Sequence, residues 1–180
     1  LLRLNTLYQP NSMDVLCWTG FYFVVIKYLK TGNAKWFFIG ATVFAMGFLN
    51  KYNIAFLLIG LLPALFLTAH RDVLKSKSFY LAVLLGLMIV FPNLIWQYKN
   101  SFPVFQHLQQ LSATQLVNVN RWEFLRSQLF FFAGSLAVLL AGFYALLVYA
   151  DFRKYKIFFW SFFFTLVVFL YFKAKDYYAI

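Results

Sequence analysis

The sequence predicts an all-α fold: a polytopic helical membrane protein with about six transmembrane helices, forming a single domain over residues 1–180. Of its residues, 63% are hydrophobic and 12% are charged, whereas a soluble domain is about half apolar and about a quarter charged. The apolar residues form long continuous runs, which satisfy their backbone in lipid as helices and are too long for barrel strands. This composition argues against a soluble nucleic-acid-binding protein, an intrinsically disordered chain and a disulfide scaffold.

Six apolar runs are candidate spans, because a helix needs about 20 residues to cross a hydrocarbon core about 30 Å thick. They cover approximately residues 13–28, 35–49, 54–69, 78–96, 124–150 and 157–172. The second run is short, and the fifth is long enough to tilt or to extend above the membrane. Pro63 and Pro92 lie inside the third and fourth runs and predict kinks there. Gly40 and Gly47, in the second run, are consistent with close helix packing.

The basic residues of the connections predict an orientation. Three short connections carry three basic residues each, as cytoplasmic loops do: Lys27, Lys30, Lys35; Arg71, Lys75, Lys77; and Arg153, Lys154, Lys156. The other basic residues fall on the alternate side: Arg3, Lys51, Lys99, Arg121, Arg126, Lys173 and Lys175. We expect the first set to be cytoplasmic. Part of the net charge of +11 then lies on the opposite face, where orientation does not require it.

The long connection over residues 97–123 lies on that opposite face. It contains apolar side chains among Gln, Ser and Asn: Phe105, Leu108, Leu111 and Leu116. This pattern predicts a short helix lying at the membrane interface. Trp96 and Trp122 bracket the connection, at the depth where Trp commonly anchors a membrane protein.

Two charged residues at span ends are candidates for function. Asp14 stands at the outer end of the first span, and it is explained either by the helix dipole or as an acid that faces an extracytoplasmic cavity. Lys51 lies between two apolar spans on the same side. It is explained either as a snorkelling side chain or as a cation held near a lipid phosphate.

The remaining polar features are open to more than one interpretation. Arg121 and Arg126 flank the start of the fifth span as anchors or as phosphate ligands. The C-terminal cluster resembles an interfacial aromatic-basic belt: Lys173, Lys175, Asp176, Tyr177 and Tyr178. His107 has no second ligand at a metal-binding spacing, and the single Cys17 has no disulfide partner. No nucleotide-binding, zinc-protease or serine-hydrolase motif is present.

Four segments, in order, resemble the membrane glycosyltransferases that use polyprenyl-phosphate sugars. They are residues 40–53 (GATVFAMGFLNKYN), 91–105 (FPNLIWQYKNSFPVF), 124–132 (FLRSQLFFF) and 173–180 (KAKDYYAI). The first is similar to a glycine-containing span that ends in Leu-x-Lys, and the second to a Pro-x-x-x-Trp segment entering an outer loop. The third resembles the start of the span after that loop, and the last a Lys-x-x-x-Tyr-Tyr stretch. The chain thus resembles family 39, the protein-mannosyltransferase and aminoarabinose-transferase-like group of GT-C architecture.

The resemblance implies transfer of a sugar, a mannose-like hexose or an aminopentose, from a polyprenyl-phosphate donor. The acceptor would be a lipid, a glycan or a protein at the extracytoplasmic face, in a bacterial inner membrane by analogy with the group. The resemblance places Asp14 near an outer-face acidic position, where it would assist catalysis or bind an ion. It assigns the donor phosphate to Lys51, Lys173 and the tyrosines after Lys175, Tyr177 and Tyr178; we add Lys175 itself and Arg121 from their positions. No cofactor is implied with certainty, and a divalent cation is left open.

The sequence departs from the family pattern in one respect. The principal catalytic acid of the family lies in a first extracytoplasmic loop after an amino-terminal span, and nothing in this sequence corresponds to either. We therefore expect an internal fragment of a longer protein, inactive by itself. A transporter segment and a non-catalytic membrane scaffold are the alternatives. The apolar span centres favour the enzyme over a transporter, whose polar groups usually lie near mid-membrane.

Overall fold

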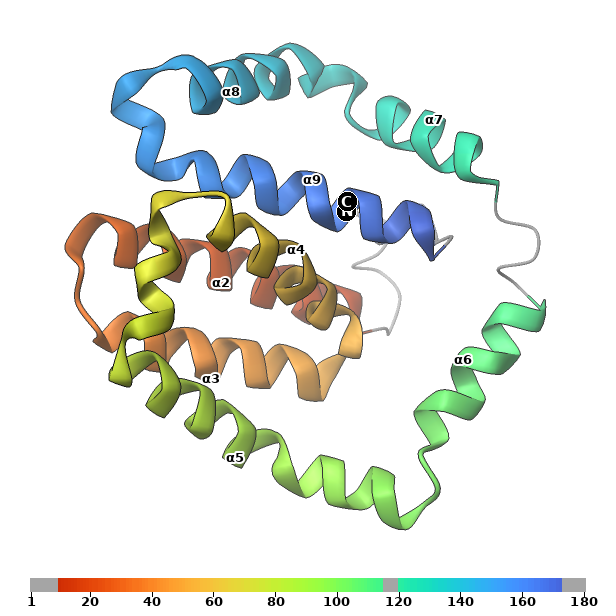
Figure 1. Ribbon diagram of the computed structural model, residues 1–180. Coiled ribbons are helices and arrows are strands. Elements are labelled where there is room, and N and C mark those ends of the chain that lie inside the picture. The colour runs from red at the N-terminus through yellow and green to blue at the C-terminus, as the bar shows by residue number, and fades with distance from the viewer. Residues whose placement is uncertain (1–9, 115–119, 173–180) are drawn as a thin grey trace.

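The computed structural model describes residues 10–114 and 120–172, and every regular element in these residues is helical. The α-helices are α2 (Asn11–Thr31), α3 (Lys35–Asn50), α4 (Ala55–Phe66), α5 (Lys77–Lys99), α6 (Pro103–Thr114), α7 (Arg121–Phe131), α8 (Leu136–Val148) and α9 (Lys156–Tyr171) (Figure 1). Short 3₁₀ segments join some of them: η1 (Tyr52–Ile54), η2 (Ala69–Lys75), η4 (Ala133–Ser135) and η5 (Ala150–Tyr155). The all-α fold is confirmed.

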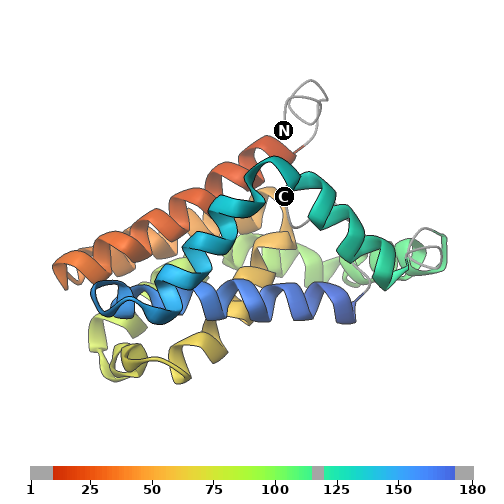
Figure 2. The ribbon, with the colours of Figure 1, turned by 90° about the horizontal axis from the view of Figure 1, so that it is seen from above.

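Two packed groups of helices form the centre of the molecule. α3 packs between α2 and α5, while α4 packs along α9 (Figure 1). The largest buried cluster joins these groups, with Cys17 from α2, Leu57 and Leu61 from α4, and Ile157 from α9. α7 and α8 run along the outer side of α9, and Figure 2 shows the same helices from above.

Small residues bring α2 and α3 close together. A Cβ atom on Gly47 would lie 2.9 Å from Cys17 Cβ, and one on Gly40 would lie 3.3 Å from a Val24 methyl. The separation at Gly47 leaves no room for a side chain and that at Gly40 is tight, so the close packing predicted from these two glycines is confirmed. This approach fixes the end of α3 beside the start of α2.

The ends of the helices alternate between two sides, as the loop charges predict. The three basic connections, residues 27–35, 69–77 and 150–156, lie at one end of the molecule, on the left of Figure 1. We call this the basic end. The start of α2, the α3–η1 connection, the end of α5 and the start of α7 lie at the opposite end.

The lengths of the helices give fewer clear spans than the predicted six. Three segments are long and apolar enough to cross a membrane, namely α2, α5 and η5 with α9, and up to five if each of two bent pairs counts as one span. α3 is an apolar helix of 16 residues and is about 24 Å long, somewhat shorter than the hydrocarbon core. α4 ends three residues after Pro63, and the chain then bends by 110° into η2. α5 continues through Pro92.

The fifth predicted span is not one helix. The segment over residues 124–150 breaks at η4, and α7 and α8 meet there at 55°. Gly134 and Ser135 supply the physical reason, because Gly/Ser pairs are a common cause of sharp helix bends. The helix predicted in the long connection does form, as α6, the most amphipathic helix described.

Candidate functional site

A polar cluster lies where the start of α2 meets the α3–η1 connection. The apolar run of α3 gives way to Asn-Lys-Tyr-Asn, and the helix ends as Lys51 adopts an extended backbone with φ of −159°. The following turn directs Asn53 back toward α2, where Asn11 and Asp14 occupy the first turn. Asn11, Asp14 and Asn53 are each at most 9% exposed. Buried polar groups are stable when their hydrogen bonds are satisfied, so the contacts of this cluster decide what it can do.

Both carboxylate oxygens of Asp14 accept hydrogen bonds. Trp18 Nε1 donates to Oδ1 at 3.1 Å, and Asn53 Nδ2 donates to Oδ2 at 3.1 Å. Lys51 Nζ forms an ion pair with Oδ2 at 3.5 Å. The helix dipole of α2 also favours a negative charge in its first turn. Asp14 is therefore a buried carboxylate held in one orientation by two donors and a nearby ammonium.

Lys51 joins this carboxylate to the surface. Its ammonium donates to Asn11 Oδ1 at 2.9 Å, and its side chain is 21% exposed, compared with 8% for that of Asp14. A partly exposed ammonium next to a buried carboxylate can contact an anion arriving from outside while the carboxylate remains sheltered. The sequence predicted both residues as candidates, and the structure brings them together.

A second chain of hydrogen bonds begins at Tyr52, which follows Lys51 in the sequence, and extends to the outer connection. Tyr52 donates its hydroxyl to Asn93 Oδ1 at 2.9 Å. The amide of Gln97 donates to the Tyr52 hydroxyl at 2.6 Å, and its oxygen accepts from the Val104 N–H at 3.4 Å. The α3–η1 connection is thereby linked through α5 to the first turn of α6.

The other predicted residues are not part of this cluster in the described structure. Arg121 donates from Nε to the Leu170 carbonyl at 3.0 Å and from Nη2 to the Tyr171 carbonyl at 3.5 Å, and it thus caps the end of α9. Its phosphate role stays a prediction. The remaining predicted phosphate ligands lie outside the described residues: Lys173, Lys175, Tyr177 and Tyr178.

Sequence reasoning missed three residues whose side chains bond Asp14 or Lys51, namely Asn11, Trp18 and Asn53. Trp18 was detectable, because it lies one helical turn after Asp14 and so shares its face. Asn11 and Asn53 reach the site through packing of α2 on α3, which no local pattern shows. Within the described residues, no group of three His, Cys, Asp or Glu side chains is placed to hold a metal ion. The divalent cation left open by the sequence stays untested.

Replacing Asn53 by Leu is expected to lower the free energy of unfolding by about 1–3 kcal/mol, because Asp14 Oδ2 loses a buried donor. Thermal unfolding of the full-length protein in detergent measures this loss. Asn50→Leu is the matched control, since its side chain bonds the Pro10 carbonyl, in a more exposed position, and not Asp14. An equal loss in both variants would show that the bond to Asp14 has no special role.

Comparison with known proteins supports the resemblance. The family model for dolichyl-phosphate-mannose-protein mannosyltransferase matches residues 1–96, slightly more than half of the 180-residue chain. The matched part includes Asp14 and Lys51 and the side chains that bond them, and it ends within α5, before Arg121. No curated protein and no solved structure matches the chain.

Proposed function

The chain belongs to the dolichyl-phosphate-mannose-protein mannosyltransferase family, a family of membrane glycosyltransferases, and from this premise we propose that it takes part in sugar transfer from a polyprenyl-phosphate donor. The acceptor is a protein, glycan or lipid hydroxyl on the face opposite the basic end. The observation that carries the proposal is the Asp14–Lys51 pair, a buried carboxylate beside a partly exposed ammonium.

The pair supplies two groups that the reaction uses. The acceptor oxygen attacks the anomeric carbon of the donor sugar, and its proton passes to the principal catalytic carboxylate of the family, a step that Asp14 assists from its sheltered position. The bond from the anomeric carbon to the phosphate oxygen breaks, and its electron pair leaves with the polyprenyl phosphate. Lys51 stabilises the negative charge that develops on this oxygen. Arg121, Lys173, Lys175, Tyr177 and Tyr178 are proposed to hold the phosphate with it.

The alternative of a transporter segment gains one observation from the fold. Broken helices are typical of transporter substrate sites, and the α7–α8 segment is broken at η4. In transporters, however, the break surrounds polar or ionic ligands. Here it lies next to Phe131, Phe132 and Leu136, with no charged side chain within η4. The polar groups of the described residues that form a network instead gather at one end of the helices, which favours the enzyme.

The donor class is tested with the full-length protein in liposomes. We expect transfer of labelled sugar from a polyprenyl-phosphate donor and none from the matching nucleotide sugar, with mannose and an aminopentose compared as the sugar. The same liposomes report uptake of free sugar. Transfer from the nucleotide sugar at an equal rate would contradict the proposed donor, and uptake without transfer would identify the transporter instead.

A further inference from the structure

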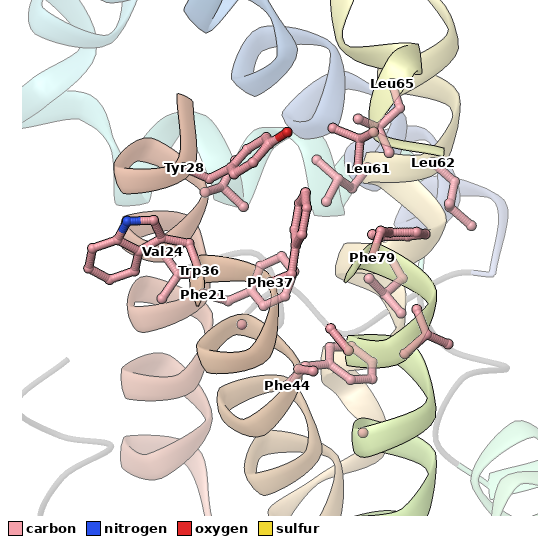
Figure 3. A pocket seen from close by; sticks show the side chains of 18 of the residues that line it. Phe21, Val24, Tyr28, Trp36, Phe37, Phe44, Leu61, Leu62, Leu65 and Phe79 are labelled. Carbon is pink, nitrogen blue, oxygen red and sulfur yellow. The ribbon is translucent and has the colours of Figure 1, made fainter. Parts of the chain in front are cut away.

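A second feature, separate from the Asp14–Lys51 pair, is an apolar cavity of ≈ 410 Å³ lined mainly by α2, α3, α4 and α5. Its wall is almost entirely hydrocarbon and aromatic, and neither member of the pair lines it. Figure 3 shows side chains that converge on it: Phe21, Tyr28, Phe37, Leu61 and Phe79. A space of this size and chemistry suits a hydrocarbon chain and not a sugar.

The cavity is open to the side, between α4 and α5. Leu62 on α4 and Val83 and Leu87 on α5 line it, and these side chains are 45%, 42% and 54% exposed. These exposed side chains are all aliphatic, so this side suits contact with the hydrocarbon of a bilayer. An acyl chain can therefore enter laterally without passing through water.

Aromatic and basic residues gather where the cavity approaches the basic end. Tyr28, Trp36, His70 and Phe79 line that part, and Tyr and Trp favour the depth of the lipid headgroups. Lys35 Nζ lies 5.3 Å from the ring centroid of Trp36. The indole Nε1 of Trp36 is buried and has no hydrogen-bond acceptor within residues 10–114 and 120–172.

Two lysines stand at the neighbouring helix starts that border this region. Lys35 begins α3 and Lys77 begins α5, and two residues further along each helix the rings of Phe37 and Phe79 are 5.8 Å apart. Both lysines are exposed. Lys75, by contrast, is paired with Asp72 at 2.7 Å. The three basic connections together hold nine basic residues and only two acidic ones, so the region attracts anions.

We propose that the cavity is a binding site for one anionic phospholipid from the leaflet at the basic end. One acyl chain fills the apolar cavity, and the phosphate lies near Lys35 and Lys77. The ring of Trp36 lies beside this phosphate, at the depth where Trp contacts lipid headgroups. The charge of the region selects the anionic headgroup, and the cavity selects the chain.

Native mass spectrometry of the full-length protein tests this site. The protein is reconstituted with equal amounts of phosphatidylglycerol and phosphatidylcholine that carry identical acyl chains. We expect one phosphatidylglycerol to be retained. Val83→Trp, which blocks the side opening, should abolish retention, whereas Leu84→Trp should not, because Leu84 is also exposed on α5 but does not line the cavity.

The headgroup is tested by removing charge. Lys35→Gln and Lys77→Gln should each weaken retention about fivefold, since a basic residue near an anionic surface contributes about 1 kcal/mol. Lys99→Gln removes the same charge from the far end of α5, at the end of the molecule opposite the basic end, and should have little effect. Equal loss in all three variants, equal retention of both lipids, or retention by Val83→Trp would overturn the site. So would one-for-one displacement of the lipid by polyprenyl phosphate, which would assign the cavity to the sugar donor.

Discussion

Replacing Lys51 by Met in the full-length protein is expected to lower sugar transfer by about 10²–10³-fold, the usual cost of removing one preorganised charge from a transition state. The same change leaves the buried Asp14 carboxylate without its ammonium partner. Because Lys51 is partly exposed, we expect the accompanying loss of unfolding free energy to stay at or below about 3 kcal/mol. Turnover at saturating donor and thermal unfolding measure the two effects separately.

A double variant separates folding from function. Lys51→Met combined with Asp14→Asn removes both charges, so stability should recover while transfer stays lost. Lys99→Met is the control for charge alone, because Lys99 ends α5 at the same end of the molecule and is exposed. If Lys51→Met keeps full transfer, Lys51 does not stabilise the leaving phosphate. If the double variant recovers transfer together with stability, the pair is structural.

Gly60→Ala is expected to cost about 3 kcal/mol of unfolding free energy, the upper part of the range for overpacking a core. A Cβ atom at this position would overlap Thr165 Oγ1 and lie 2.7 Å from the Ser161 carbonyl oxygen. The second contact is with the backbone of α9, which moves only if the whole helix moves. Since α4 and α9 form one of the main helix contacts, the added methyl group forces these two helices apart at the centre of the fold. Thermal unfolding of the full-length protein measures the loss.

Two further variants identify the cause. Gly142→Ala in α8 is the matched control, because a Cβ there meets nothing within 4 Å, and it should be neutral or slightly stabilising. Gly60→Ala with Thr165→Ala should recover part of the loss, since the hydroxyl is removed while the backbone contact remains. A stability of Gly60→Ala equal to that of Gly142→Ala would show that α4 and α9 are less tightly packed than described.

The helical fold could be predicted because its signal is local. Continuous apolar runs correspond to α2, α3, α4, α5 and α9, and the amphipathic pattern of the long connection corresponds to α6. The glycines of α3 indicated its close contact with α2. The break between α7 and α8 was missed, because the run over residues 124–150 was judged by its length. Gly134 and Ser135, inside that run, carried the contrary signal.

The contacts of the candidate site could be predicted only in part. Asp14 and Lys51 were recognised as charges at span ends on one side, but their pairing depends on how closely two helices pack. Asn53 reaches Asp14 across 39 positions of the chain. For Arg121 the sequence suggested a partner other than the one that the structure shows. As a cation next to an outer loop, it was predicted to be a phosphate ligand. In the structure its guanidinium caps the carbonyls that end α9, a partner that composition cannot reveal.

The side-chain amide of Gln97 forms hydrogen bonds through both its nitrogen and its oxygen, and so connects two parts of the molecule. One side of it bonds the Tyr52 hydroxyl, next to Lys51, and the other bonds the Val104 N–H at the start of α6. The start of α6 is therefore tied by hydrogen bonds to the turn that carries the Lys51 ammonium. If an acceptor contacts α6 and a donor binds near Lys51, the side chain of Gln97 connects the two binding sites.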